Sequence, residues 1–295
     1  MKVLSLCGGI ETGYLALKQL GVSVEEYHTF EISPAAIKVA QYHFPEIVHH
    51  GNVIGADFSQ FKGFDMVIGG PCCQSLSITR ADNSQLSNGL LGKSGIFYEV
   101  VRAIEEIQPK YFLVENVVPK SREDQDKMSA LLGCEPIQIN SFAFVPQDRV
   151  RLYWTNITIN PPPPECNLCI MDIMEHNVPT WSRYHYKQDY DWHGLDKRVC
   201  ATLHVNTMDM LKRVYSPFFK APTLTCVSGG YQEKKVWDRG PRKMTCLEYE
   251  RLQGLPDGFT DVGGLTDTQR RSLCGNGWTL PVIKWIFKEI LQWNS

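Results

Sequence analysis

The 295-residue sequence lacks the features that mark several large classes of protein. It has no apolar run long enough to span a bilayer, and its formal net charge of -2 provides no overall basic field for nucleic acid, although a local basic face would be enough. No secretory leader precedes the first predicted strand, so we expect the ten cysteines to be free thiols in a reducing cytoplasm. No G-x-x-x-x-G-K-[ST] occurs, which excludes a P-loop nucleotide hydrolase. With 43% hydrophobic and 21% charged residues, the chain is typical of a globular protein with one large and one smaller domain.

Apolar runs alternate with helical patterns along the first part of the chain. Strands are predicted at residues 2–6, 27–30, 66–70, 111–115, 137–144 and 152–154, and helices at 14–20, 34–43, 95–108 and 124–132. This alternation predicts an α/β fold with a doubly wound, mostly parallel sheet and helices on both faces.

Four consecutive prolines at residues 161–164 end this alternation, because a proline run cannot enter the interior of a sheet. The chain then stays polar and aromatic to about residue 240, and helices are predicted again at 245–252 and 280–293. We therefore expect a large domain at 1–160, a small loop-rich region at 161–240, and a C-terminal segment at 241–295 that returns to the first domain.

The central motif of the chain lies at residues 64–77, with the sequence Phe-Asp-Met-Val-Ile-Gly-Gly-Pro-Cys-Cys-Gln-Ser-Leu-Ser. It predicts a short buried strand that breaks on two glycines and a proline. Cys72 and Cys73 then follow the carboxyl end of the strand, where open α/β sheets bind their ligands. This stretch alone leaves open a buried structural thiol. Cys166 and Cys169 have the spacing of a zinc-ligand pair, but no second pair follows, and we predict no metal site.

A second candidate ligand site follows the first predicted strand. Residues 7–13, Cys-Gly-Gly-Ile-Glu-Thr-Gly, lie between a strand and a helix, where a nucleotide-like ligand can meet the amides of a helix N-terminus. The loop is not a G-x-G-x-x-G, so alone it is a weak signal. Glu31, at the end of the next strand, can accept hydrogen bonds from both hydroxyls of a ribose. The two features together predict a nucleotide-like cofactor.

Four more motifs follow in order: Glu-Asn-Val at 115–117, Gln-Asp-Arg-Val-Arg at 147–151, Arg-Leu-Gln-Gly-Leu-Pro at 251–256 and Gly-Asn-Gly-Trp at 275–278. With the Pro-Cys loop ahead of them, their order and spacing resemble the motifs of DNA (cytosine-5)-methyltransferases. The resemblance covers nearly the whole chain except about residues 161–220. It is strongest for the catalytic domains of the animal de novo enzymes and for phage and prokaryotic enzymes like them, through Ile-Glu-Thr-Gly-Tyr at 10–14, Glu-Asn-Val-Val at 115–118 and Trp278.

The resemblance implies a class I methyltransferase fold and a role for each motif. Cys73 would be the nucleophile that adds to carbon 6 of cytosine, because it precedes Gln74, whereas Cys72 replaces a proline of the family pattern. Glu115 would hold and protonate N3 of the base, and Arg151 would contact O2. Arg149 would order this site or bind a neighbouring phosphate. The target cytosine would have to leave the duplex stack, and the residues implied to contact substrate are Gln74, Ser77, Asn116, Arg183 and Lys187.

The implied cofactor is S-adenosyl-L-methionine, with S-adenosyl-L-homocysteine as the product. Glu31 would bind the ribose and Ile32 a face of the adenine. Asn52 stands where the family usually has an aspartate for the adenine amine, and its amide oxygen can still accept from that amine. The remaining residues implied to surround the cofactor are Cys7, Gly8, Gly9, Ile10, Thr12, Val53, Pro71, Ile96, Asn276, Gly277 and Trp278.

By its position, the region at 161–240 would read the sequence of double-stranded DNA. It interleaves basic residues, among them Arg183 and Lys187, with Tyr184, Tyr186, Tyr190 and Trp192, as suits phosphate contact and groove entry. Acidic residues nearly balance these charges, so a solvated surface is the alternative that composition leaves open. The resemblance further implies the cytoplasm of a prokaryotic or phage-infected cell, no membrane association and no obligate protein partner. A cognate restriction enzyme would be a partner if the enzyme belongs to a restriction-modification system.

Three other functions are weighed against this interpretation. An RNA cytosine-5 methyltransferase of the transfer-RNA type shares the fold, but its Cys-Phe-Thr stretch is missing from the region at 161–240. A nicotinamide oxidoreductase also uses a doubly wound sheet, yet Cys73, Glu115 and Arg151 have no ready role in hydride transfer. A non-catalytic DNA-binding relative would be expected to have lost Cys73 or Glu115.

Overall fold

The computed structural model describes residues 1–71, 95–176 and 178–292. The chain divides into two compact units. The first unit comprises Met1–Ile139, Val150–Pro161 and Ile283–Ser295, and the second comprises Asn140–Arg149 and Pro162–Val282. Among the helices that the structure describes, none has the length and apolar character needed to cross a membrane.

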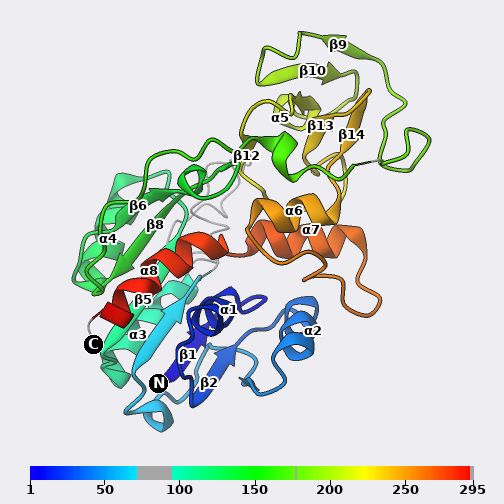
Figure 1. The fold of residues 1–295 in the computed structure, drawn as a ribbon. Helices are drawn as coiled ribbons and strands as arrows, with labels where there is room; N and C mark the ends of the chain where they lie inside the picture. Colours follow the sequence, from blue (N-terminus) through cyan, green and yellow to red (C-terminus); the bar gives the residue numbers. More distant parts are fainter. Residues whose placement is uncertain (72–94, 177, 293–295) are drawn as a thin grey trace. The chain divides into compact units, whose positions relative to one another are not determined.

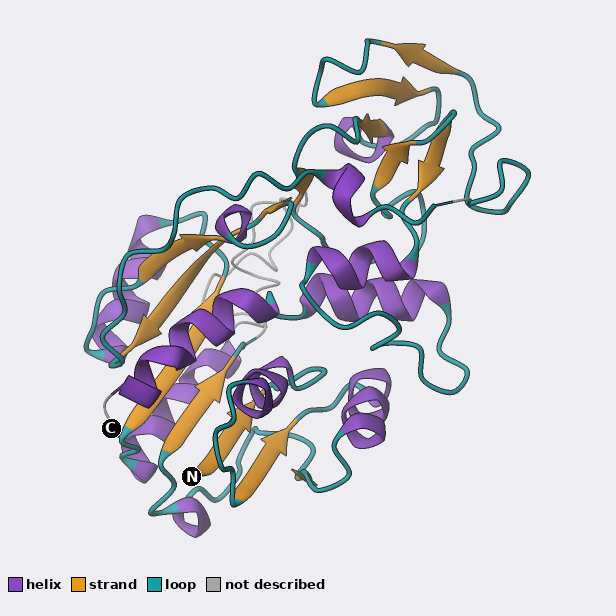
Figure 2. Cartoon of the chain, in the orientation of Figure 1, coloured by secondary structure: helices purple, strands orange, loops and turns teal. Residues whose placement is uncertain are grey.

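A seven-stranded sheet forms the centre of the first unit (Figure 2). Its order is β3-β2-β1-β4-β5-β8-β6. β1 pairs in parallel with β2 and β4, β2 with β3, and β4 with β5, whereas β8 runs antiparallel to β5. The strands are β1 (Lys2–Leu6), β2 (Glu26–Phe30), β3 (Val48–His49), β4 (Met66–Gly69), β5 (Tyr111–Asn116), β6 (Ile137–Asn140) and β8 (Val150–Thr155). The predicted mostly parallel sheet is confirmed.

The helices of the first unit are α1 (Thr12–Gln19), α2 (Pro34–His43), α3 (Ile96–Ile107), α4 (Arg122–Leu132) and α8 (Leu280–Gln292), with a 3-10 turn, η1 (Ser59–Phe61). Figure 1 shows α3 behind the sheet and α8 crossing the opposite face. Phe97, Val100 and Ala103 of α3 belong to a buried cluster with Leu4 and Val67 of the sheet. The amphipathic pattern of α3 is thus explained by packing, which supplies most of the stability of such a helix.

The strand order creates one place where ligands can enter. β1 and β4 are neighbours, and the chain turns from β1 toward β2 on one side and from β4 toward β5 on the other. Loops that leave the carboxyl ends of two such strands diverge, and the crevice between them is where doubly wound sheets bind ligands. The loop after β1 and the residues Gly70 and Pro71 after β4 lie at this position.

The second unit contains a five-stranded sheet of order β14-β13-β11-β10-β9 and a two-stranded pair of β12 with β7. These strands are β7 (Gln147–Asp148), β9 (Tyr190–Trp192), β10 (Val199–Leu203), β11 (Arg213–Tyr215), β12 (Ala221–Pro222), β13 (Lys235–Trp237) and β14 (Pro241–Lys243). Its helices are α5 (Asp209–Lys212), α6 (Cys246–Leu252) and α7 (Asp267–Asn276), with a 3-10 turn, η5 (Ile170–Ile173). The expectation that residues 161–240 are loop-rich misses this sheet, because its strands are short and lack a regular alternation of buried and exposed residues.

Two further expectations differ from the structure. The strand predicted at 137–144 ends at Asn140, whose side chain accepts from the backbone N–H of Phe142 and starts a 3-10 turn, η4 (Ser141–Ala143). A side chain that caps its own chain in this way competes with the strand ladder. The division expected near residue 160 lies close to the unit boundary at Pro161, whereas residues 240 and 241 both lie inside the second unit.

Candidate functional site

The loop from β1 to α1, residues 7–11, has an unusual backbone. Cys7, Gly9 and Glu11 have φ angles of 58°, 60° and 57°, so left-handed residues alternate along it. The N–H groups of Cys7 and Glu11 donate to the carbonyls of Phe30 and Gly8 over 2.8 and 3.0 Å. The N–H of Gly9 donates to Oε2 of Glu31 over 2.8 Å, which ties the loop to the end of β2.

The carboxylate of Glu31 is held in a defined orientation. Its Oε1 accepts from the backbone N–H groups of Ile32 and Ser33 over 2.8 and 2.7 Å. A carboxylate oxygen offers two lone pairs, so these two bonds saturate Oε1, whereas Oε2, which accepts from Gly9, can still accept from a hydroxyl of a sugar. Ile32 next to it is exposed over 65% of its surface, an unusual position for an isoleucine. A carboxylate beside an exposed apolar side chain suits a nucleoside, with its polar sugar and flat base.

Thr12, at the start of α1, carries a buried hydroxyl with no hydrogen-bond partner among the described residues. Buried polar atoms are almost always satisfied, so this one fits a ligand that supplies the partner. Ile10 and Val53 are buried in the first unit, and Ile96 is partly buried against the core of that unit. Asn52 is exposed, and its Oδ1 accepts from the N–H of Ile54 over 3.0 Å. The residues present therefore fit the nucleotide-like cofactor expected here.

Glu115 and Arg151 form an ion pair at the same edge of the sheet. Glu115 lies next to the end of β5 and Arg151 near the start of the antiparallel β8, which brings their side chains together. Nε of Arg151 lies 3.0 Å from Oε1 of Glu115, and both side chains are largely buried, with exposures of 13% and 12%. Nη1 of Arg151 donates to its neighbouring carbonyl, that of Val150, over 2.7 Å. A buried carboxyl group beside a guanidinium can bind both the donor and the acceptor edge of a polar ring.

Asn116 joins this pair to the end of β4. Its Nδ2 donates to the carbonyl of Pro71 over 3.3 Å, and its Oδ1 accepts from the N–H of Val117. The ends of β4 and β5 are therefore held together in the first unit. Cys73, Gln74 and Ser77, predicted from the sequence, lie outside the described residues.

Arg149 lies in the second unit and is buried there. Its guanidinium donates to the carbonyls of Leu224, Gly275 and Gly277 over 2.9, 3.2 and 3.0 Å. The bonds to Gly275 and Gly277 fix the backbone on either side of Asn276, at the end of α7. Trp278 is the next residue in the chain. Arg149 thus orders the segment that carries three of the predicted cofactor residues.

Replacing Arg149 by methionine is expected to lower the free energy of unfolding by about 3–5 kcal/mol, because buried carbonyls would lose a charged donor. Denaturant titration measures this change. Arg122→Met is the matched control, since Arg122 forms an exposed ion pair with Asp126 on α4 and its loss should cost less than about 1 kcal/mol. Equal denaturation midpoints for the two variants would contradict the role of Arg149.

Two buried glutamines, Gln147 and Gln253, belong to the same hydrogen-bond network. The sequence analysis noted them only as members of motifs. Gln147 donates to the carbonyl of Leu252 over 2.8 Å and accepts from the N–H of Leu224 over 2.9 Å. Gln253 donates to the carbonyls of Cys274 and Gly277. Neither side chain is exposed. Their presence inside two motifs was the available signal, because a glutamine is rarely buried without bonds to specific backbone groups.

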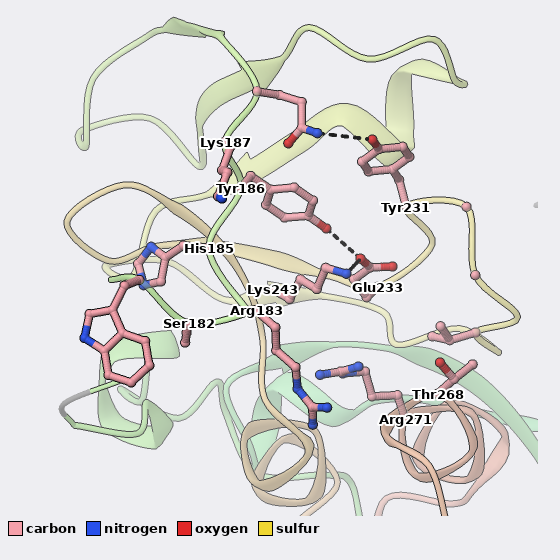
Figure 3. Close-up of a pocket in the computed structure, with 15 residues that line it drawn as sticks. Ser182, Arg183, His185, Tyr186, Lys187, Tyr231, Glu233, Lys243, Thr268 and Arg271 are labelled. Atoms are coloured by element: carbon pink, nitrogen blue, oxygen red, sulfur yellow. Dashed lines mark hydrogen bonds and ion pairs between the residues drawn. The ribbon is translucent and has the colours of Figure 1, made fainter. Parts of the chain in front are cut away.

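A polar pocket of about 600 Å³ lies within the second unit (Figure 3). Tyr186 points into it and donates to Glu233 over 2.7 Å, and Lys243 lies 2.9 Å from the same carboxylate. Arg183 and Lys187, both predicted to contact substrate, line it together with Arg271. Most of the lining charge is therefore positive.

The side chains around this pocket differ in their ion pairs and in their exposure to solvent. Arg183 is exposed and lies 2.9 Å from Asp267, whereas the exposed Lys187 forms no ion pair with a residue that the structure describes. Trp181 is exposed over 86% of its surface, and Trp192 over 48%, so neither is a core residue. Exposed indoles near cations are common where proteins bind nucleic acid. The described residues contain no group of three or more His, Cys, Asp or Glu side chains that could hold a metal ion.

Comparison with known proteins gives three findings. A family model described as C-5 cytosine-specific DNA methylase matches residues 1–130 and 140–292. The orphan methyltransferase M.SPRI of Bacillus phage SPR is 32% identical over 168 residues, which span 52% of this chain and 37% of that protein. The type II methyltransferase M1.ScrFI of Lactococcus lactis subsp. cremoris is 25% identical over 321 residues, which span 99% of this chain and 78% of that protein.

Two solved structures have the same fold. The methyltransferase EhMeth of Entamoeba histolytica gives a TM-score of 0.74 at 17% identity, covering 100% of this chain and 99% of that one. The Dnmt2 methyltransferase of S. pombe gives a TM-score of 0.70 at 17% identity, covering 100% of both chains. These likenesses confirm the predicted α/β fold.

Proposed function

Because the chain belongs to the family of C-5 cytosine-specific DNA methylases, we propose that it methylates carbon 5 of cytosine in double-stranded DNA with S-adenosylmethionine as donor. The observation that carries this proposal is the buried pair of Glu115 and Arg151 at the carboxyl edge of the sheet that bears Glu31. The phage relative matches over little more than a third of its length, so substrate and partners are proposed here for this chain itself.

The first unit would hold the cofactor at the β1–α1 loop. Oε2 of Glu31 accepts from a ribose hydroxyl, Ile32 packs against the adenine, and the unpartnered hydroxyl of Thr12 bonds to the ligand. When bound, S-adenosylmethionine supplies an electrophilic methyl group. The other residues of the first unit proposed to surround it are Cys7, Gly8, Gly9, Ile10, Asn52, Val53, Pro71 and Ile96.

The base needs activation because carbon 5 of cytosine is a poor nucleophile. In the proposed mechanism the thiolate of Cys73 adds to carbon 6, and the ring becomes an enamine whose carbon 5 can attack a methyl group. Glu115 donates a hydrogen bond or a proton at N3, and Arg151 stabilises the charge that develops at O2. Loss of the proton from carbon 5 and departure of the thiol then restore the aromatic ring. Since these groups cannot reach a stacked base, the cytosine must be flipped out of the duplex.

The second unit would supply contacts to DNA. Arg183 and Lys187 line a pocket whose charge is mostly positive, and Trp181 lies exposed beside them in the chain. Such groups bind phosphates and position a duplex without reading its bases.

Lys187→Ala is expected to weaken binding to all duplexes alike and to reduce the slope of log K against log salt by about one. Fluorescence anisotropy at several salt concentrations measures that slope. Lys62→Ala is the control, because Lys62 is an exposed lysine that precedes β4, at the opposite end of that strand from the ligand-binding edge. An unchanged slope in the Lys187 variant would remove this residue from the DNA contact.

The proposed function is tested by incubating the wild-type protein with tritiated S-adenosylmethionine and either unmethylated duplex DNA or structured RNA. Label is expected in DNA alone and should be recovered as 5-methylcytosine. Label in RNA alone would move the assignment to an RNA cytosine-5 methyltransferase on the same fold. Absence of label from both would overturn the proposal.

A further inference from the structure

The side chain of Glu11 lies buried beneath the β1–α1 loop. It is exposed over only 1% of its surface. The hydroxyl of Tyr27 donates to its Oε2 over 2.8 Å, and that of Thr29 donates to its Oε1 over 2.5 Å. Both donors come from β2, and Ser5 of β1 adds a third hydroxyl. All three bonds favour the ionised form of the carboxyl group.

The carboxyl group also supports the loop from below. A Cβ atom placed on Gly8 would lie 2.0 Å from Oε1 of Glu11 and 2.6 Å from Oγ of Ser5, so only glycine fits there. Glu11 itself has φ 57° and ψ 45°, a left-handed conformation that is costly for a glutamate. A strained backbone and a buried acid therefore occur in the same residue of the loop.

None of the main electrostatic influences on Glu11 is a cation. They are burial, the three hydroxyls and the carboxylate of Glu31, and burial raises the pKa of Glu11 to about 7. Tyr14 packs against Tyr27 at 4.7 Å between ring centroids but reaches a different acid, Glu46. The N-terminus of α1 provides only a partial positive charge. Among the residues that the structure describes, the ionised carboxylate thus has no full counter-charge under the ligand-binding loop.

We propose that Glu11 is a positioning residue whose carboxylate supplies the counter-charge for a cationic ligand on the β1–α1 loop. The sulfonium methyl donor would then bind more tightly than the neutral thioether product that remains after transfer. This inference rests on the proposed function, since the resemblance assigns the loop to the methionine part of S-adenosylmethionine. It gives the buried acid a role in product release.

The test is the ratio of the dissociation constants of S-adenosylhomocysteine and S-adenosylmethionine, measured by calorimetry from pH 6 to pH 9. In the wild-type protein this ratio is expected to rise about tenfold as Glu11 loses its proton near pH 7, because only the donor carries the extra positive charge. The positive sulfonium lowers the pKa of the donor's amino group below that of the product's, so the ligands contribute a pH dependence of their own, which Glu11→Gln measures and which is subtracted. His49, which faces Glu31, has a pKa lowered by burial and stays neutral over most of this range.

Three variants sharpen the test. In Glu11→Gln the ratio should keep only the pH dependence of the ligands' amino groups and be about tenfold lower than that of the wild type at pH 8. In Thr29→Val the midpoint should move to higher pH, because the ionised carboxylate loses a donor. Glu46→Gln is the matched control: Glu46 accepts from Tyr14 and Lys18 of the same helix, α1, and its loss should leave the ratio unchanged.

The outcomes separate this inference from the proposed function. If the wild-type protein binds neither ligand, the proposed function fails. If it binds both and the ratio has the same pH dependence as in Glu11→Gln, the role of Glu11 is overturned and the function stands. Equal weakening of both ligands in Glu11→Gln would also overturn it, since that result needs only a structural role. Should Glu11→Gln not fold, the wild-type pH series and Thr29→Val still decide.

Discussion

Replacing Cys73 by serine is expected to lower the rate of methyl transfer to DNA by at least about four orders of magnitude. A thiol ionises several pH units below an alcohol and its thiolate is the stronger nucleophile, so a serine at this position cannot add to carbon 6 at a useful rate. Single-turnover transfer of tritium from S-adenosylmethionine to duplex DNA measures the loss. Binding of DNA and of the cofactor should persist, because neither depends on the nucleophile.

Cys72→Ser is the matched control for this variant, since it makes the same chemical change one residue earlier. Its rate should stay within about tenfold of the wild type, as expected for a neighbour that takes no part in bond formation. DNA containing 5-fluorocytosine supplies an independent readout. Fluorine cannot leave carbon 5 as a proton does, so wild type and Cys72→Ser should be trapped as covalent complexes and Cys73→Ser should not. Trapping of Cys73→Ser but not of Cys72→Ser would transfer the nucleophile to Cys72.

Glu115→Gln is expected to lower the rate of transfer by about two to four orders of magnitude. The amide has nearly the same shape and can still accept from Nε of Arg151 through its oxygen, so the local structure should be retained. It cannot deliver a proton to N3 of the base, and the enamine would then form against a larger barrier. Rapid-quench kinetics with saturating DNA and cofactor measure this step directly.

The control for Glu115→Gln is Glu106→Gln, which removes an exposed carboxylate that pairs with Arg102 on α3. Its rate should equal that of the wild type. The affinity for S-adenosylmethionine should be the same in all three proteins. A Glu115→Gln enzyme within about threefold of the wild-type rate would exclude proton donation by Glu115.

The elements that could be predicted from the sequence are those with local signals. α2 begins at Pro34 and ends at His43, as its apolar spacing and its proline predict. β4 is buried along its whole length, which explains why it appears as an uninterrupted apolar run. α7 was not predicted, because most of Asp267–Asn276 is polar and little of the helix is apolar enough to form a stripe. In β9 all of Tyr190–Trp192 is exposed, and a strand with no buried face leaves no period-two pattern to read.

For the site, the resemblance assigned Glu115 and Arg151 to the same base, but their ion pair depends on β8 running antiparallel to β5. The position of Glu31 at the end of a strand was predicted from the sequence. The burial of Glu11 and its left-handed backbone conformation could not be predicted from the sequence. The sequence analysis gave Glu11 no individual role in its loop, whereas the structure shows this residue buried and in a left-handed conformation. Arg149 was expected from its motif to order the base site or to bind a neighbouring phosphate, and its bonds to three carbonyls depend on residues up to 128 positions away.

The chain crosses between its two units four times, since the short segment Asn140–Arg149 belongs with Pro162–Val282. Gln147 and Arg149 of that segment bond to backbone groups of the longer one. A chimaera that exchanged only residues 162–282 between relatives would set foreign carbonyls against the host's Gln147 and Arg149. Recombination that transplants a working second unit must therefore carry both segments together, which limits how readily such a gene can acquire a new specificity by a single exchange.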